Sequence, residues 1–342
     1  MKVGILSGGG DAPGINAVIR AVVRKGIQNY GYEIAGIKDG WHGLLENELV
    51  PLDLKSVSGI LPRGGSILGT TRTNPFKREK GPEKMRENAK KAGIGAVIAI
   101  GGDDTLSVAS KMAEYGLKCV GVPKTIDNDL AGTDYTFGFM TAVTTATEAL
   151  DRLHTTAETH QRVMILEVMG RYAGWIALEA GLAGGADIIL IPEKPFTIEE
   201  ICKYIKHRQK RGRNFSIVVV AEGAKPKGGA EIVYSDSVDE FGHIRLGGIG
   251  YYVGKEIEKC MNIETRVVVL GHLQRGGSPT AFDRILATRF GIAAVDLVHE
   301  KKFGRMVAIQ GNKIVSVPLK DVIGKRRTVD LELYDIARVF FG

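Results

Sequence analysis

Cysteine is scarce in this chain, and its placement bears on which kinds of site to expect. The 342 residues include three cysteines, Cys119, Cys202 and Cys260, which lie far apart and form no Cys-x-x-Cys pair. The seven histidines show no His-x-x-x-His spacing. We therefore expect neither a disulfide framework nor a zinc or histidine metal site, and we expect a protein of the reducing cytoplasm.

Long apolar runs are also missing. No stretch approaches the roughly 18 residues that a membrane span needs. The apolar start, Met1 to Leu6, gives way at once to Ser7-Gly8-Gly9-Gly10-Asp11. This segment is too short for a signal peptide, so we read it as a first strand and expect no membrane association.

Basic residues outnumber acidic ones, but they do not gather as a nucleic-acid site would require. The net charge is +7. The one dense basic run, 203–213, follows the apolar positions Ile201 and Ile205 and is typical of a solvated helix end. No zinc-finger or RNP-type signature is present, and anionic small substrates account for positive charge equally well. We expect no nucleic-acid partner.

The chain does contain a regular alternation of short apolar runs and longer amphipathic stretches. This pattern predicts an α/β fold with two Rossmann-like, doubly wound lobes. The expected strands are Lys2–Ser7, Tyr32–Lys38, Ala96–Ile100, Cys119–Pro123, Val163–Met169, Asp187–Ile191, Ile217–Ala221 and Val267–Gly271. The expected helices include Gly14–Tyr30, Pro82–Ala92, Met140–Thr156 and Phe282–Val298.

We expect two lobes that the chain enters more than once. Residues 1–138, joined by about 275–323, would form the first lobe. Residues 139–274, joined by the C-terminal segment, would form the second, with the functional site in the cleft between the lobes. The Gly- and Lys-rich segment 224–250 is typical of an exposed hairpin or loop insertion.

Two polar segments follow successive predicted strands and carry the clearest chemical signal. They are Gly101-Gly102-Asp103-Asp104-Thr105 and Pro123-Lys124-Thr125-Ile126-Asp127-Asn128-Asp129. Each places its side chains at the carboxyl edge of a sheet, where open α/β folds bind ligands. Helix capping explains one acidic residue of the first segment, and an Asx turn would explain the second segment if it stood alone. Together they predict a site for magnesium and phosphate, with Asp103 assigned to the metal.

Glycines and arginines add to this prediction. Residues 7–14, Ser-Gly-Gly-Gly-Asp-Ala-Pro-Gly, join the first strand to a helix but match neither a Walker A loop nor a dinucleotide fingerprint. A tight structural turn and a phosphate loop are equally open for this segment alone. Arginines recur at positions that we read as turns after strands, where their forks could bind phosphate: Arg72, Arg162, Arg171, Arg266 and Arg275.

Over nearly its whole length the chain resembles the bacterial-type phosphofructokinases. The resemblance rests on Gly8–Gly14, Arg63-Gly64-Gly65, Gly101-Gly102-Asp103, Thr125–Asp129, Met169-Gly170-Arg171 and Gly271–Gly277. It implies phosphoryl transfer to the 1-hydroxyl of fructose 6-phosphate, with Mg²⁺, in a homo-oligomer (tetramer or dimer) in the cytoplasm. In the family, Arg162 and Arg266 reach into a neighbouring subunit's site.

The resemblance also assigns roles to individual residues. Asp127 matches the general base, Asp103 the magnesium-linked acid and Arg171 an arginine that stabilises the transition state. The implied donor contacts are Gly10, Arg72, Asp103, Asp104, Thr105 and Lys124. The implied sugar-phosphate contacts are Thr125, Asp127, Arg162, Met169, Gly170, Arg171, Glu222, Arg266, His272 and Arg275.

Two positions indicate which donor is used. ATP-using members of the family carry Gly where this chain has Asp104, and Gly where it has Lys124. A carboxylate about 4 Å from a phosphate costs on the order of 1–4 kcal/mol, so Asp104 disfavours the longer nucleotide, while Lys124 offsets the charge of inorganic pyrophosphate. The prediction is therefore a pyrophosphate user that acts reversibly, and the alternative is an ATP-dependent 6-phosphofructokinase.

Regulation by nucleotides is not expected. His154 stands where allosteric ATP-using members carry an arginine, although Arg20 and Arg24 do match effector positions. Two more distant alternatives are a lipid or nucleotide kinase sharing the Gly-Gly-Asp-x-Thr segment, and a basic protein whose sugar-phosphate site has decayed. The Met-Gly-Arg and His-Leu-Gln-Arg segments disfavour the first, and the presence of Asp103, Asp127 and Arg171 disfavours the second.

Overall fold

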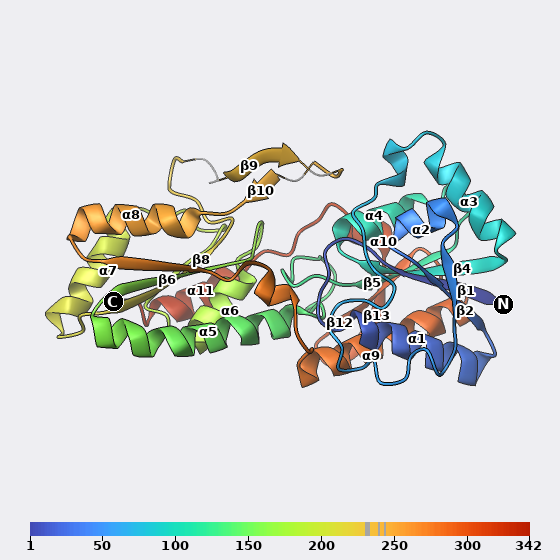
Figure 1. Ribbon diagram of the computed structural model, residues 1–342, viewed down its shortest axis with the longest axis horizontal. Helices are drawn as coiled ribbons and strands as arrows, with labels where there is room; N and C mark the ends of the chain where they lie inside the picture. Colours follow the sequence, from blue (N-terminus) through green and yellow to red (C-terminus); the bar gives the residue numbers. More distant parts are fainter. Residues whose placement is uncertain (230–232, 239, 243) are drawn as a thin grey trace. The chain divides into compact units, whose positions relative to one another are not determined.

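The chain divides into two compact units, each built around its own sheet (Figure 1). The computed structural model describes residues 1–229, 233–238, 240–242 and 244–342. Unit 1 comprises 1–141, 239–243 and 275–326, and unit 2 comprises 142–238, 244–274 and 327–342. The predicted α/β class is confirmed, because both sheets are mainly parallel and are covered by helices.

Unit 1 holds a sheet of strand order β13-β12-β5-β4-β1-β2-β3. The pairs β1–β2, β1–β4, β4–β5 and β5–β12 are parallel, and β2–β3 and β12–β13 are antiparallel. The strands are β1 (Lys2–Ser7), β2 (Glu33–Ile37), β3 (Leu49–Leu52), β4 (Ile94–Gly101), β5 (Cys119–Pro123), β12 (Arg305–Gln310) and β13 (Lys313–Pro318).

Helices cover both faces of this sheet (Figure 1). The core on one face includes Ile5, Ile98 and Phe290, and the core on the other includes Leu6, Val97 and Leu106. Alternate residues of one strand therefore enter opposite cores, which explains why β1 and β4 read as continuous apolar runs. The first face carries α1 (Ile15–Tyr30) and α9 (Ala281–His299), and the second carries α2 (Trp41–Glu46), α3 (Gly81–Lys91), α4 (Asp103–Lys111) and α10 (Leu319–Val322).

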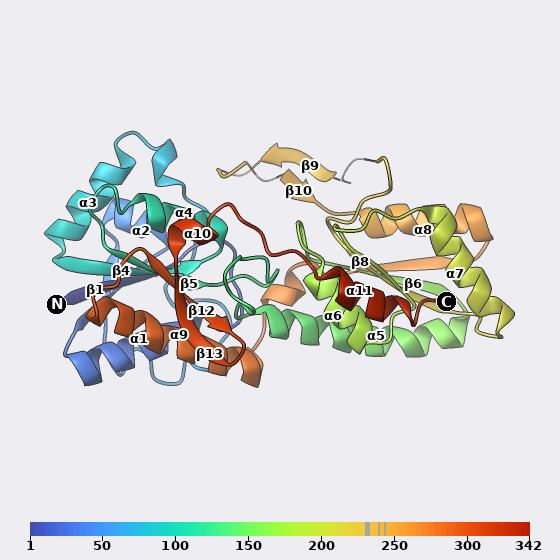
Figure 2. The same cartoon turned by 180° about the vertical axis from the view of Figure 1, so that it is seen from behind.

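Unit 2 holds a smaller parallel sheet of order β11-β6-β8-β7. Two helices pack on one face, and Figure 2 shows α5 and α6 on the other side. The strands are β6 (Val163–Val168), β7 (Ile188–Leu190), β8 (Ser216–Ala221) and β11 (Thr265–Val269). The helices are α5 (Phe139–His160), α6 (Trp175–Ala183), α7 (Ile198–Lys210), α8 (Ile249–Met261) and α11 (Leu331–Arg338), with α7 and α8 on the first face.

The predicted insertion contains a short antiparallel pair, β9 (Val233–Val238) and β10 (Ile244–Leu246). Residues 230–232, 239 and 243 of the predicted segment 224–250 lie outside the described residues. The predicted strands β1 and β5 have the expected bounds, while β3, β12 and β13 were not predicted.

The expectation that no disulfide forms was wrong. Cys202 of α7 and Cys260 of α8 are paired, with Cα atoms 6.7 Å apart. The two helices pack against each other and so bring together cysteines that are 58 residues apart in the sequence. Cys119 is buried and unpaired, and burial raises the pKa of its thiol to about 12.

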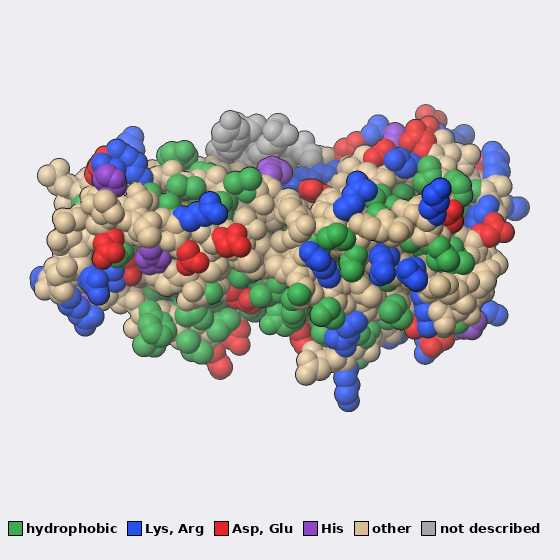
Figure 3. Space-filling model, turned by 60° about the horizontal axis from the view of Figure 1, so that its bottom comes forward, with side chains coloured by type: hydrophobic (Ala, Val, Ile, Leu, Met, Phe, Trp, Pro, Cys, Tyr) green, Lys and Arg blue, Asp and Glu red, His purple; other side chains and the backbone are tan. Residues whose placement is uncertain are grey.

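Two surface observations complete the description. None of the described helices is both long enough and apolar enough to cross a membrane. Figure 3 shows one face of the molecule, on which the coloured Lys and Arg side chains lie among acidic and uncharged ones. They do not merge into one continuous basic surface on that face.

Candidate functional site

In unit 1 the loops that follow β1, β4 and β5 are joined by backbone hydrogen bonds at the carboxyl edge of the sheet. The Gly8 N–H donates to the carbonyl oxygen of Ile100, and the Lys124 N–H donates to that of Gly101, both at 2.9 Å. The Gly9 N–H donates to the Thr71 carbonyl at 2.9 Å. The predicted glycine loop, the segment before Arg72 and both acidic segments therefore meet at one place.

Glycines make this meeting possible because they leave room for Thr105. A Cβ atom at Gly101 would lie 2.3 Å from the Cβ of Thr105, and one at Gly8 would lie 2.7 Å from its Oγ1. Thr105 is buried between the two loops. Gly10 is constrained in a similar way, since a Cβ there would lie 3.0 Å from a terminal nitrogen of Arg275. The glycines at these positions thus serve close packing.

Lys124 is the buried cation of this edge. Its side chain is 4% exposed, and its ammonium donates to the carbonyl oxygen of Gly10. Burial, together with the nearby Arg275 and Arg72 and against the opposing effect of Asp11 and Asp127, lowers the pKa of Lys124 to about 8. A cation this poorly hydrated, beside two guanidinium groups, is a strong attractor for a small multivalent anion.

Asp103 and Asp104 lie in the first turn of α4, as predicted. The N-cap is Gly102, and no side chain caps the helix there. Asp103 Oδ1 accepts a hydrogen bond from the backbone N–H of Gly324 at 3.1 Å, and Asp104 is half-buried. Side-chain capping therefore does not account for this acidic pair.

The turn that carries Asp127 and Asp129 is shaped by Asn128. Asn128 has φ 52°, a conformation that Asn tolerates better than most residues. Its Oδ1 accepts from the Thr136 N–H at 3.0 Å, and its amide donates to the Asp134 carbonyl at 3.3 Å. These two bonds join Asn128 to residues eight and six positions on, whereas an Asx turn bonds the backbone two residues on. A bond of that local kind is donated by the Asp127 N–H to the Thr125 hydroxyl at 3.1 Å. The turn leaves Asp127 and Asp129 half-buried on either side of it.

Asp129 shows that carboxylates crowd this edge. Burial, together with the charges of Asp127 and Asp103 and against the opposing effect of Arg326, raises the pKa of Asp129 to about 7. Sequence reasoning missed Arg326, which pairs by a backbone bridge with Leu130. The run Lys325-Arg326-Arg327 was a visible signal, but nothing in the sequence shows that it returns to this edge.

The described residues include no group of three His, Cys, Asp or Glu side chains placed to hold a metal by themselves. The acidic edge still fits magnesium, because Mg²⁺ is commonly held by one or two carboxylates together with substrate phosphates and water. Asp103 has one carboxylate oxygen on the Gly324 N–H, and the mutual repulsion among Asp103, Asp127 and Asp129 would be relieved by a divalent cation.

In unit 2, the loops after β6 and β8 are also joined at the carboxyl edge. The Glu222 N–H donates to the Val168 carbonyl at 2.8 Å, and the Gly223 N–H donates to the Gly170 carbonyl at 3.1 Å. The Met169 N–H donates to Gln274 Oε1 at 3.2 Å, which ties in the turn that carries His272. Met169, Gly170, Arg171, Glu222 and His272 therefore come from connected loops.

Two predicted arginines lie elsewhere, and our placement of them after strands was wrong. Arg162 directly precedes β6, and Arg266 is the second residue of β11. Both form ion pairs with Glu264, at the amino edge of the same sheet. Six residues of strand separate Arg162 from Met169, a span of roughly 20 Å, so one small sugar phosphate cannot touch both edges within one copy.

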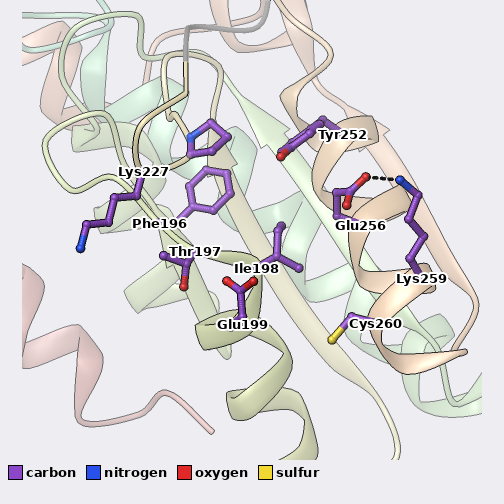
Figure 4. Close-up of a pocket in the computed structure, with 10 residues that line it drawn as sticks. Phe196, Thr197, Ile198, Glu199, Lys227, Tyr252, Glu256, Lys259 and Cys260 are labelled. Carbon is purple, nitrogen blue, oxygen red and sulfur yellow. Dashed lines mark hydrogen bonds and ion pairs between the residues drawn. The ribbon is translucent and has the colours of Figure 1, made fainter.

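A further pocket lies in unit 2 and contains none of the predicted site residues. Figure 4 shows it between the first turn of α7, with Thr197 and Glu199, and the face of α8 that carries Tyr252 and Glu256. Its volume is about 480 Å³. Glu256 is engaged by Lys259 at 2.6 Å, and the Thr197 hydroxyl caps α7 by accepting from the Glu200 N–H.

A buried lysine, arginines and glycine loops at the carboxyl edge of a parallel sheet are typical of an enzyme that binds and transfers phosphate. Residues 2–298 match the family described as Phosphofructokinase, and the chain belongs to that family.

Curated relatives match from end to end. The chain is 58% identical over 343 residues, covering 100% of both chains, to "Pyrophosphate--fructose 6-phosphate 1-phosphotransferase" of Streptomyces coelicolor. It is 51% identical, with the same coverage, to "ATP-dependent 6-phosphofructokinase" of Mycobacterium bovis. Among solved structures, a phosphofructokinase from Pichia pastoris in the T-state matches with a TM-score of 0.83 and 33% identity, covering 99% of this chain and 36% of that one.

Proposed function

We propose that this enzyme transfers a phosphoryl group between inorganic pyrophosphate and the 1-hydroxyl of D-fructose 6-phosphate, giving fructose 1,6-bisphosphate and phosphate, in either direction. The observation that carries the proposal is the buried Lys124, held on the glycine loop beside Arg72 and Arg275, together with Asp104 in the first turn of α4. This arrangement concentrates positive charge for a short diphosphate. It also sets a carboxylate against a longer polyphosphate.

The proposed chemistry uses side chains in separate roles. Asp127 accepts the proton of the attacking 1-hydroxyl as the new P–O bond forms. The bridging P–O bond of pyrophosphate breaks, and Lys124 stabilises the charge on the departing phosphate. Arg171 stabilises charge on the phosphoryl group during transfer. In the reverse direction, Asp127 returns the proton to the sugar oxygen.

Magnesium fits the donor side of this scheme. Asp103 would hold the ion together with oxygens of the donor, in keeping with its position at the acidic edge. When bound, the ion supplies charge neutralisation between the two phosphates of the donor. The carboxylates would set where the ion lies, and the charge of the ion would offset the repulsion between these carboxylates and the anionic donor.

The sugar phosphate would be held by residues from both edges of the unit 2 sheet. Met169, Gly170, Arg171, Glu222 and His272 belong to the carboxyl edge of that sheet. Thr125 and Asp127 are two further proposed contacts. Arg162 and Arg266 lie at the amino edge, too far away to contribute within one copy. We therefore propose a homo-oligomer, a dimer or tetramer, in which they complete the site of another subunit, and we place the reaction in the cytoplasm.

The alternative donor is ATP, and relatives named for each donor are similar to the chain. The experiment is a comparison of initial rates for purified protein with fructose 6-phosphate, Mg²⁺ and either donor. We expect kcat/KM with pyrophosphate to exceed that with ATP by about tenfold or more. We also expect pyrophosphate to form from fructose 1,6-bisphosphate and phosphate. Asp127→Asn should lose on the order of 10²–10⁴ in rate with either donor.

A higher kcat/KM with ATP would overturn the pyrophosphate assignment but not the family. If the wild-type protein is inactive with both donors, the proposal that it phosphorylates fructose 6-phosphate is overturned. The chelation of Mg²⁺ should abolish activity, and restoring the ion should recover it.

A further inference from the structure

The short segment between β9 and β10 carries a carboxylate that contacts the residues following Arg72, all within unit 1. Glu240 and Phe241 follow β9, and both belong to unit 1 by their contacts. Glu240 Oε2 accepts a hydrogen bond from the backbone N–H of Asn74 at 2.9 Å. Its other oxygen, Oε1, accepts from the guanidinium of Arg78 at 2.5 Å. The Glu240 carboxylate therefore accepts hydrogen bonds from both ends of the segment 74–78.

That segment directly follows Arg72, the arginine expected to touch the donor phosphate. The Asn74 side chain caps the N-terminus of the short helix η1 (Pro75–Lys77) by accepting a hydrogen bond from the Phe76 N–H at 3.1 Å. Phe76 meets Tyr115 edge-on, with ring centroids 6.0 Å apart. Phe76 and Phe241 both pack against the same core cluster of unit 1. The segment between β9 and β10 thus makes apolar as well as polar contacts beside η1.

On its other side, Arg72 is held by a threonine network. The Thr71 hydroxyl donates to the Asp39 carbonyl at 2.7 Å and lies 3.0 Å from the Thr73 hydroxyl. The Thr71 carbonyl accepts from the glycine-loop N–H of Gly9. Arg72 therefore sits between two anchored points, and the second anchor, at Asn74, depends on a residue more than 160 positions away.

We propose that Glu240 is a positioning residue for the pyrophosphate side of the reaction. Its hydrogen bonds hold the backbone that follows Arg72 in place, so the exposed Arg72 side chain is already oriented before the donor binds. Donor binding then loses less conformational entropy, because this part of the chain is already ordered. This inference rests on the proposed function. It gives the insertion a role in donor affinity and none in sugar binding or in the chemical step.

The base of the hairpin is anchored as well. Downstream of β10, the N–H groups of Gly248 and Gly250 donate to the two carboxylate oxygens of the buried Glu167, at 3.0 and 2.8 Å. Glu167 lies in β6. The chain that follows β10 is thus tied to the sheet of unit 2.

The test compares three variants with the wild-type protein. Glu240→Ala removes both hydrogen bonds, whereas Glu240→Gln keeps an acceptor for the Asn74 N–H. The matched control, Glu46→Ala, breaks an ion pair of similar exposure in the same unit, Glu46–Lys84 at 3.0 Å. For each protein, kcat and KM are measured with each substrate varied in turn, and the thermal unfolding midpoint checks that the variants are folded.

We expect Glu240→Ala to raise KM for pyrophosphate about three- to tenfold, with kcat and KM for fructose 6-phosphate within about twofold of wild type. Glu240→Gln should recover most of the donor affinity, and Glu46→Ala should match wild type. An unchanged KM for pyrophosphate in Glu240→Ala overturns the inference, as does an equal rise in both KM values. If the wild-type protein itself does not use pyrophosphate, the proposed function fails instead, which separates the two outcomes.

Discussion

Lys124 is the residue whose surroundings most constrain the chemistry. Its ammonium donates to the Gly10 carbonyl oxygen, and its burial, together with two nearby arginines, lowers its pKa to about 8. A lysine in this state changes charge just above neutral pH. Donor capture by the free enzyme should therefore depend on pH in a way that an ordinary surface lysine would not produce.

We predict that kcat/KM for pyrophosphate falls as the pH rises above about 8, because the free enzyme loses the Lys124 proton there. Lys124→Arg keeps its positive charge at every pH in the measured range, so its kcat/KM should not fall above about pH 8, whatever its absolute activity. The measurement is a kcat/KM profile from about pH 6.5 to 9.5. If kcat/KM of Lys124→Arg falls above about pH 8 as in the wild-type protein, the fall is caused by the titration of another group.

Neighbouring glycines of the donor edge should differ in their tolerance of a side chain. Gly101→Ala places a Cβ 2.3 Å from the Cβ of Thr105, whereas at Gly102 the nearest atom beyond the chain neighbours, the Lys124 carbonyl oxygen, is 3.6 Å from the added carbon. We expect Gly101→Ala to lower the free energy of unfolding by about 1–3 kcal/mol and Gly102→Ala to change it little. Equal effects in urea denaturation would contradict the packing described for Thr105.

Sequence reasoning at this scale succeeded where a residue's neighbours in the chain determine its place. Asp103, Lys124 and Asp127 follow strands whose apolar runs are unambiguous, so their edge of the sheet was predictable. Arg162 was misplaced although the predicted start of the strand that it precedes, Val163, was correct. For Arg266 the strand start was misjudged as well, since β11 begins at Thr265 and not at Val267. Arg326 and Glu240 act through contacts across more than 150 residues, which no local pattern reveals.

At the scale of elements, the start of α5 is held by a buried carboxylate at the start of α9. Asp283 Oδ2 accepts from the Thr141 N–H at 2.7 Å and from its hydroxyl at 2.5 Å. Burial raises the pKa of Asp283. Thr141 is the last residue of unit 1 before α5 continues into unit 2, so this contact fixes the helix at the point where it leaves the unit.

The sign of the pH effect follows from the raised pKa of Asp283. The folded state binds more protons at this site than the unfolded state from about pH 4 upward, so its contribution to stability falls as the pH rises through that window. Asp283→Asn removes the titration and keeps an acceptor for Thr141. We expect the variant to gain stability relative to wild type between pH 4 and pH 8 in urea denaturation, and a constant difference would contradict this.

The helices and strands that could be predicted were those with a long and uninterrupted pattern of apolar residues. The helices α1, α3 and α9 and the strands β1, β4 and β5 were found because their apolar residues face a core on one or both sides. The strand β3 carries Pro51 in a four-residue run and gave no strand pattern. The pair β12–β13 was missed although Gly311-Asn312 between two alternating runs is a hairpin signal.

At the scale of the whole molecule, the separation of the two edges of the unit 2 sheet has the largest consequence. If Arg162 serves another subunit's site, then Arg162→Ala and Asp127→Asn disable a shared site from different chains. Each variant alone should be inactive or nearly so. We predict that mixed oligomers, made by co-expression with two affinity tags, recover activity, because one site in the hybrid then holds both native residues.

The control for that experiment is a hybrid of Asp127→Asn with Lys124→Ala. Both residues lie in unit 1 and are supplied to a site by the same chain, so every site of this hybrid keeps one defect. The first hybrid should be active under conditions in which separately purified variants, mixed without subunit exchange, are not. Inactive hybrids of Arg162→Ala and Asp127→Asn, or a monomer in light scattering with full activity, would contradict the shared site.

The donor itself is tested most directly by the ratio of kcat/KM for pyrophosphate to that for ATP, measured in the wild-type protein and in Asp104→Gly. The carboxylate in the first turn of α4 is expected to hold this ratio at about ten or more. Its removal should lower the ratio by a similar factor, through a gain with ATP. A wild-type ratio below one, or a ratio that Asp104→Gly leaves unchanged, would contradict the assignment of this site to inorganic pyrophosphate.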